Sequence, residues 1–215
     1  MKAQIAVARA IILDTAINTD LANATGDKTF KTRAAFLTPI AKAFGTDTGS
    51  EVADLGIQVH GGMGFIEETG AAQFARDVRV TRIYEGTNGI QSMDLVARKL
   101  MDGGTAAFAV LEDIKATAAN NPTLAAAEFA LRQATKTLLA SDTLNSRFAG
   151  ASAYLRAFAL TLGGHYLTRG ATDNNRTSLN AFYTAHFLPQ VNALCASATS
   201  GDSLLYAINT DKLAG

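Results

Sequence analysis

The chain has 215 residues, enough for one domain or two small ones, and its 19 basic and 19 acidic side chains leave a formal net charge of zero. This balance argues against a nucleic-acid-binding protein and against a protein held on a membrane by clustered basic residues, because both need surplus positive charge. Hydrophobic residues make up 48% of the sequence, which is typical of a globular chain, and the single cysteine, Cys195, excludes an internal disulfide and a cysteine-based zinc site.

The first predicted element is a helix over residues 2–21, with Ile5 and Ile12 on its apolar stripe. Arg9 interrupts this stretch and Asp14 follows it, so we interpret it as part of the fold and not as a signal peptide. No apolar run approaches the ~20 residues that a membrane-spanning helix needs, and we expect a cytoplasmic protein with no membrane span. Because the helical pattern starts at the very beginning of the sequence, with no capping residue before it, we also expect the chain to be a piece of a longer protein.

Two further helices are predicted before residue 61. The first covers residues 33–44 and ends at Gly45. The second begins at Thr48, which forms a capping-box pattern with Glu51, and it ends at Gly61-Gly62.

A loop is expected over residues 60–70, followed by a short helix over 71–80 and another helix that starts near Thr87. The segment Met101-Asp102-Gly103-Gly104 is the best candidate for a domain boundary. We therefore predict two domains, residues 1–100 and residues 101–215.

The second half is rich in alanine and leucine at helical spacing. It predicts helices over residues 105–119, from Pro122 onward with Asn121 as the cap, over 145–169, and from about 173 to 198. Pro189 should kink or break the last of these, and a short final helix is expected beyond Gly201. Since no segment shows the alternation of a strand, we predict an all-α protein, an up-down helical bundle with an additional helical extension.

Most residues with reactive side chains favour an ordinary structural interpretation. His60, His165 and His186 do not lie at metal-ligand spacing from one another, so we expect no metal site. Cys195 lies on an alanine-rich helical face and is interpreted as a small, inert core residue.

Two segments are unusual for a helical protein. Residues 58–65 contain glycines at positions 61, 62 and 64, which either end a helix or let the backbone approach a ligand closely. Residues 82–91 place Glu85 between Tyr84 and a Gly-Thr helix start. A carboxylate in this position is either a partner for the helix dipole or a catalytic group.

In this order, and with Arg76-Asp77 between them, the two segments resemble the C-terminal helical domain of the flavin-dependent acyl-CoA dehydrogenases. The resemblance covers residues 1–100 and implies a four-helix-bundle domain that is truncated at its start. The run from Tyr84 to Leu100 is similar to a bacterial subgroup with an added C-terminal helical region, which includes the 3-methylmercaptopropionyl-CoA dehydrogenases. Residues 101–215 resemble that extension through Phe182-Tyr183 and the run from Leu188 to Gln190.

The reaction implied by the resemblance is α,β-dehydrogenation of an acyl-CoA thioester. Glu85 occupies the position of the base that removes the α-proton, and FAD would accept the hydride. Such a base needs a carboxylate whose pKa is raised by exclusion of water, together with a donor to the enolate oxygen, which the resemblance assigns to the Glu85 N–H. Tyr84 and Gly86 are implied to line the acyl site.

The resemblance also implies where FAD is held. Thr87, Asn88 and Gly89 match positions that touch the phosphate side of the flavin. Positions that contact the adenine half of a neighbouring subunit's flavin match Gln58, Gly61 and Gly62. We therefore expect a homo-oligomer, with electron-transfer flavoprotein as the partner of a dehydrogenase. Because most flavin and substrate contacts would lie outside this chain, we expect the isolated chain to lack FAD and to be inactive.

Two alternatives stay open at this point. The chain could be a catalytically silent helical assembly module, or part of an acyl-CoA oxidase that passes electrons to oxygen. The presence of Glu85 favours an enzyme over a silent module. The residues do not separate dehydrogenase from oxidase, because oxygen access depends on the shape of the pocket.

Overall fold

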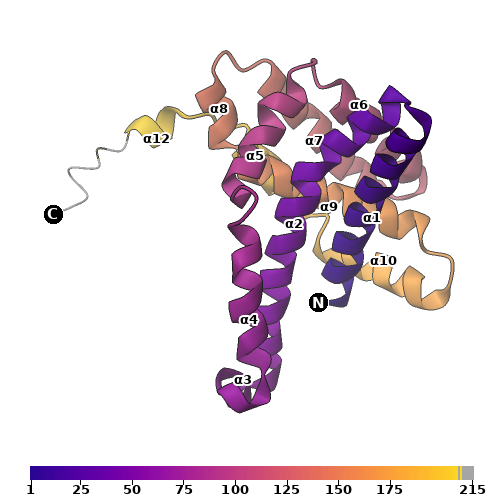
Figure 1. Ribbon diagram of the computed structural model, residues 1–215. Helices are drawn as coiled ribbons and strands as arrows, with labels where there is room; N and C mark the ends of the chain where they lie inside the picture. Colours follow the sequence, from indigo (N-terminus) through magenta and orange to yellow (C-terminus); the bar gives the residue numbers. More distant parts are fainter. Residues whose placement is uncertain (208, 210–215) are drawn as a thin grey trace.

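The computed structural model describes residues 1–207 and residue 209, and this part of the chain is helical and contains no strand (Figure 1). The α-helices are, in chain order, α1 (Lys2–Thr25), α2 (Lys28–His60), α3 (Gly62–Phe65), α4 (Ala71–Arg79), α5 (Asn88–Val96), α6 (Thr105–Thr117), α7 (Pro122–Leu139), α8 (Leu144–Ala149), α9 (Ala151–Arg169), α10 (Asn174–His186), α11 (Gln190–Ala198) and α12 (Ser203–Ala207). Short 3₁₀ turns are η1 (Glu67–Thr69), η2 (Val80–Arg82), η3 (Arg98–Leu100) and η4 (Ala118–Asn120). The predicted all-α fold class is confirmed.

The longest helix, α2, organises the first half of the molecule. Its 33 residues span about 50 Å at 1.5 Å per residue. The helix begins where Gly26 ends α1 in a left-handed conformation and the Asp27 carboxylate caps the Thr29 amide at 2.7 Å. Figure 1 shows α1 beside one half of α2 and α4 beside the other half, with α3 at the turn between α2 and α4.

The core of the molecule is built around α9, which comes from the second half of the sequence. Twelve of its 19 residues are buried. The helix contacts α1, α2 and α5 from the first half as well as α7, α10 and α11 from the second. At one of these contacts the Phe158 ring meets Phe36 of α2 edge to face, with 5.0 Å between ring centroids. The two halves therefore share one hydrophobic cluster, while the predicted division into residues 1–100 and 101–215 stays a prediction.

Several predicted helix ends are confirmed by their caps. Gly61 ends α2 with a positive φ, and the Asn121 side chain caps α7 by accepting a hydrogen bond from the Leu124 amide. The chain breaks at Pro189, between α10 and α11, because proline lacks the amide that would continue the helix. A short final helix, α12, is also present, whereas residues 208 and 210–215 of the predicted tail lie outside the described residues.

The prediction of two helices between residues 33 and 60 is wrong, because α2 runs through this stretch without a break. Gly45 lies inside the helix, and Thr48 is buried in it and does not form an N-cap. A glycine costs a helix only about 1 kcal/mol relative to alanine, so packing against α1, α4, α5 and α9 outweighs this local preference. Gly45 also leaves room for Ile12, whose terminal methyl would lie 3.3 Å from a Cβ at that position.

Two other details differ from the sequence-based expectation. The buried stripe of α1 contains Val7 and Ile11, whereas Ile5 and Ile12 are partly exposed, so the predicted stripe is rotated. The helix expected over residues 145–169 breaks at Gly150. A Cβ there would lie 2.0 Å from the carbonyl oxygen of Ala198, so only glycine permits this close approach of α11.

Among residues 1–207 and 209, no helix has both the length and the apolar character needed to cross a bilayer.

Candidate active site

The segment that carries Glu85 is a loop, residues 83–87, between η2 and α5; we call it the Glu85 loop. Glu85 has φ 54° and is the only non-glycine residue with a positive φ in the described part of the chain. Gly86 follows with φ 85°. A left-handed conformation costs a residue with a Cβ about 1–2 kcal/mol, and such strain persists only where the surrounding structure imposes it.

The carboxylate of Glu85 is exposed and makes no hydrogen bond or ion pair with any described residue. It borders an open pocket of about 430 Å³ that Gly86, Ile90 and Gln91 also line. Phe148 of α8 lines the same pocket, although it comes from the second half of the chain. The side chain is therefore not part of a structural ion pair and is free to meet a molecule in this pocket.

In the loop backbone, two carbonyl groups accept hydrogen bonds from side chains, whereas one N–H group has no acceptor among the described residues. The carbonyl of Glu85 accepts a hydrogen bond from Gln91 Nε2 at 3.0 Å, and the carbonyl of Gly86 accepts one from Lys42 Nζ at 2.7 Å. The Glu85 N–H donates no hydrogen bond within residues 1–207. An unpaired N–H beside an exposed carboxylate is the arrangement that polarises a carbonyl next to a base.

The other predicted site residues near the loop differ in their surroundings. Thr87 is the N-cap of α5, and its hydroxyl accepts a hydrogen bond from the Ile90 amide. Asn88 is anchored to α2 by its side-chain amide, whose nitrogen bonds Asp47 Oδ1 at 2.9 Å, so this side chain is already occupied. Tyr84 is half-exposed and borders a separate groove between α1 and α2, and thus does not share the pocket beside Glu85.

Gln58, Gly61 and Gly62 lie at the other end of α2 and are exposed. Twelve residues separate Gln58 from Thr46, the level at which Asn88 is anchored, which is about 18 Å along the helix. The structure therefore does not bring the two groups of expected flavin-contacting residues together within one chain. A Cβ at Gly61 or Gly62 would meet nothing within 4 Å, so this backbone is open to an approaching group.

These observations test whether the residues fit FAD. The glycine backbone at positions 61, 62 and 89 is accessible, and Gln58 is exposed, which fits contact with two separate parts of a large cofactor. The side chain of Asn88 does not fit a direct contact, because α2 already satisfies its amide. The residues expected to contact FAD therefore fit it only in part, and they lie at two distant places on the chain.

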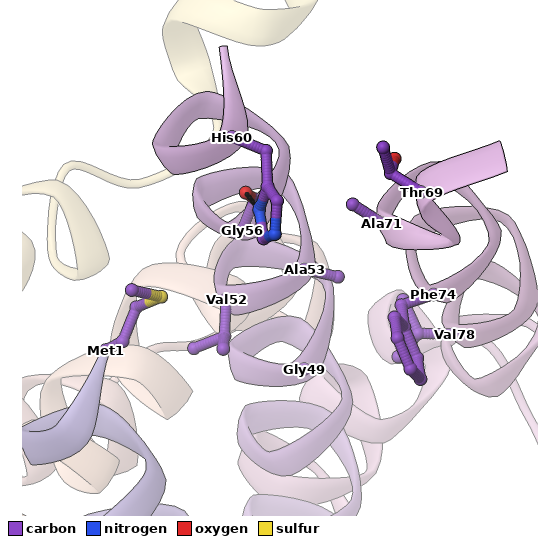
Figure 2. Close-up of a pocket in the computed structure, with 10 residues that line it drawn as sticks. All are labelled: Met1, Gly49, Val52, Ala53, Gly56, His60, Thr69, Ala71, Phe74 and Val78. Carbon is purple, nitrogen blue, oxygen red and sulfur yellow. Dashed lines mark hydrogen bonds between the residues drawn. The ribbon is translucent and has the colours of Figure 1, made fainter. Parts of the chain in front are cut away.

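An apolar cleft of about 440 Å³ separates α2 from α4 (Figure 2). Figure 2 shows the His60 ring and the Phe74 ring on opposite sides of this gap. The Nδ1 atom of His60 lies 2.8 Å from the Gly56 carbonyl oxygen. None of the site residues predicted from the sequence lines this cleft.

The remaining reactive side chains are buried or paired. Burial, followed by the charge of Arg169, lowers the pKa of His165 to about 4, and neither ring nitrogen has a hydrogen-bond partner in the described residues. Burial raises the pKa of the Cys195 thiol to about 11, so the thiol stays protonated, in agreement with a core residue. Arg76 forms a surface ion pair with Glu67. Residues 1–207 and 209 contain no cluster of three or more metal-ligating side chains.

The sequence analysis missed Lys42 of α2, which contacts the Glu85 loop directly. The available signal is the position of a lysine between Ile40 and Ala43, both of them buried in the core. A charged residue on such a face is rarely buried without a partner, so it points to an acceptor supplied by another element.

Comparisons with known proteins agree with the resemblance inferred from the motifs. Residues 1–101 match the family model described as acyl-CoA dehydrogenase, C-terminal domain. The chain is 58% identical over 85 residues to 3-methylmercaptopropionyl-CoA dehydrogenase of Ruegeria pomeroyi. The matched stretch covers 39% of this chain and 14% of the relative. It is 41% identical over 97 residues to butyryl-CoA dehydrogenase of Syntrophomonas wolfei, covering 44% of this chain and 16% of the relative.

The fold has a counterpart among solved structures. A crystal structure of an acyl-CoA dehydrogenase complexed with FAD from Bacillus anthracis superposes with a TM-score of 0.56 and 21% identity, over 83% of this chain and 34% of that one. At this identity the likeness concerns the fold alone. The chain spans about one seventh of the length of the two curated relatives. The motif-based resemblance is thus confirmed, and residues 1–101 are similar to the C-terminal domain of the acyl-CoA dehydrogenases.

Proposed function

We propose that the chain is part of a flavin-dependent acyl-CoA dehydrogenase in which Glu85 removes the α-proton of an acyl-CoA thioester. The observation that carries the proposal is the free, exposed carboxylate of Glu85 on a strained loop, beside an open pocket. Strain at a residue of this kind is typical of functional sites, where neighbouring contacts hold a side chain in place. The similarity to two acyl-CoA dehydrogenases supports the same assignment.

In this proposal the residues of the chain perform the proton transfer. One Glu85 carboxylate oxygen takes the α-proton, and the free Glu85 N–H donates to the thioester oxygen, where negative charge develops. Gly86 has no side chain, so the substrate can approach the backbone closely in the pocket that both residues line. FAD, when bound, supplies the hydride acceptor for the β-hydrogen.

The position of Gln58, Gly61 and Gly62 supports a homo-oligomer in which they contact the FAD of a second subunit. They are exposed and lie at the end of α2, about 18 Å along the helix from the turn that anchors Asn88 next to the Glu85 loop. The side chains of Phe65 and Phe74 nearby are 82% and 74% exposed, an unusual amount of apolar surface for a monomer. Electron-transfer flavoprotein is the proposed electron acceptor.

The test is Glu85→Gln in the full-length protein, because glutamine keeps the size of the side chain but cannot accept the proton. Acyl-CoA-dependent reduction of bound flavin should fall by about 10³-fold or more, with flavin content unchanged. Glu68→Gln is the matched control, since Glu68 is also exposed and has no partner among the described residues. Near-normal turnover by Glu85→Gln would contradict the proposal, and turnover that yields hydrogen peroxide from oxygen would favour the oxidase alternative.

A further inference from the structure

We propose that Lys42 is a positioning residue that holds the Glu85 loop in its strained conformation. This inference rests on the proposed role of Glu85 and adds a residue that neither the motifs nor the family match assigns to the site. Lys42 acts from α2 and does not line the Glu85 pocket; it lines the separate groove that Tyr84 also borders.

The ammonium group of Lys42 joins one acceptor in the loop to one at the start of α5. Its Nζ atom donates to the Gly86 carbonyl at 2.7 Å and to Asn88 Oδ1 at 2.9 Å. Charged donors form hydrogen bonds roughly twice as strong as neutral ones, and this one is partly buried. Lys42 therefore ties the residue directly after Glu85 to the helix beneath it.

Asn88 extends this connection to the next turn of α2. Its side-chain nitrogen donates to the Ala43 carbonyl at 3.2 Å, to Thr46 Oγ1 at 3.0 Å and to Asp47 Oδ1 at 2.9 Å. The side chain of Asn88 is thus fixed in the orientation that presents Oδ1 to Lys42.

The N-terminal side of the loop is tied to the same turn of α2. Arg82, the residue before the loop, forms an ion pair with Asp47 at 2.7 Å. Both ends of the loop therefore depend on residues 42–47 of α2. Of these contacts with α2, only the Lys42–Gly86 bond reaches the loop backbone itself, while the Glu85 carbonyl is held from α5 by Gln91.

Backbone strain explains why this tie matters. Two consecutive left-handed residues, Glu85 and Gly86, turn the Gly86 carbonyl towards α2. Without the Lys42 ammonium, this partly buried carbonyl loses its partner, and Glu85 is free to relax to a negative φ. Such a change rotates the backbone that directs both the carboxylate and the N–H of Glu85.

The structure also shows that Lys42 acts through the backbone and not on the carboxylate. No ion pair joins Lys42 to Glu85 among the described residues, and the bonds of its Nζ go to a carbonyl and an amide oxygen. It should therefore affect where Glu85 points more than how strongly substrate binds.

The first experiment measures how fast the backbone amides of the loop exchange with deuterium in the 215-residue chain. Lys42→Met keeps most of the side-chain length but removes the donor. The two hydrogen-bonded amides that border the loop centre, those of Tyr84 and Gln91, should then exchange about tenfold faster, as expected when one hydrogen bond that holds the loop is lost. Amides of α9 should be unchanged. Lys31→Met is the matched control, since Lys31 lies on the same helix, is exposed, and its side chain has no partner in the described part.

The second experiment measures turnover in the full-length protein. Lys42→Met should lower kcat by about 100-fold with KM nearly unchanged, because a base displaced by about 1 Å loses efficiency of that order. Lys42→Arg keeps a cationic donor and should restore part of the loss. A variant that merely destabilised the fold would instead show faster exchange in α9 as well.

The outcomes separate this inference from the proposed function. If Lys42→Met changes neither loop exchange nor kcat, the positioning role of Lys42 is overturned. If Glu85→Gln retains turnover while Lys42→Met still mobilises the loop, the proposed role of Glu85 fails and the structural part of the inference stands.

Discussion

Helix α9 and the Glu85 loop differ in burial and in the contacts that hold them in place. α9 is buried along twelve of its 19 residues and contacts helices from both halves of the molecule. The Glu85 loop has only a few anchors to α2, and most of its side chains are exposed. Hydrophobic packing therefore fixes the scaffold, while a small set of polar contacts sets the orientation of the candidate base.

This contrast indicates where substitutions should act. Changes on α9 should lower the free energy of unfolding, because each removes packed apolar contacts or fills space that is already occupied. Changes at Lys42 or Glu85 should alter function with little effect on unfolding.

Truncating Phe158 in the core should cause the greatest loss of stability. The side chain is fully buried against Phe36 and Tyr154, so Phe158→Ala should lower the free energy of unfolding by about 3–5 kcal/mol. Phe65→Ala, at a ring that is 82% exposed, should change it by no more than about 0.5 kcal/mol. Urea denaturation measures both, and equal losses would show that α9 is not the main source of stability.

Lowering the pH should reduce the free energy of unfolding because of His165. Burial is the main cause that lowers its pKa to about 4, and Arg169 adds to it, whereas Asp113 and Asp14 act in the opposite direction. Between pH 6.5 and 4 the unfolded chain binds a proton that the folded chain does not, so stability falls as the pH falls. The loss should total roughly 3 kcal/mol.

Replacing the imidazole tests this pH dependence. His165→Leu should remove most of the slope in the free energy of unfolding between pH 6.5 and 4. Substitution of the exposed His186 by leucine should leave the slope in place. An unchanged slope in His165→Leu would assign the acid sensitivity to other groups.

Replacing two glycines by alanine should change the free energy of unfolding by smaller amounts and in opposite directions. A Cβ at Gly163 of α9 would lie 2.3 Å from Tyr183 Oη and 2.7 Å from a Val7 methyl carbon, so Gly163→Ala should cost about 1–3 kcal/mol. Gly56 of α2 has nothing within 4 Å of this position, and Gly56→Ala should stabilise the protein by about 0.5–1 kcal/mol. Thermal unfolding of the two variants shows whether each substitution lowers or raises the stability. A change in the same direction for both would contradict the tight packing of α9 at Gly163 and the open surface of α2 at Gly56.

Local signals in the sequence predict helix ends well, and the phase and continuity of helices less well. The Asn121-Pro122 start, the Gly61 end and the Pro189 break depend on backbone chemistry that is local, and all three are confirmed. The continuity of α2 through Gly45 depends on packing by distant elements, which no local pattern reports.

In the candidate site, too, local features can be predicted from the sequence and tertiary features cannot. The motif identifies Glu85 as a candidate base, but the free state of its carboxylate and its positive φ are tertiary properties. Lys42 is distant from Glu85 in the sequence, and its contact with Gly86 exists only because η2 and α5 fold back on α2. The motif therefore points to the proposed base, Glu85, but not to Lys42, the residue that we propose positions it.

Exchange of the α-proton of an acyl-CoA in deuterated water, followed by mass spectrometry with the full-length protein, decides whether Glu85 is the base. Proton removal by Glu85 predicts rapid deuterium incorporation at the α-carbon with the unaltered protein and with Glu68→Gln, and almost none with Glu85→Gln. Equal incorporation by the two variants would show that another group removes the proton and that Glu85 is not the base.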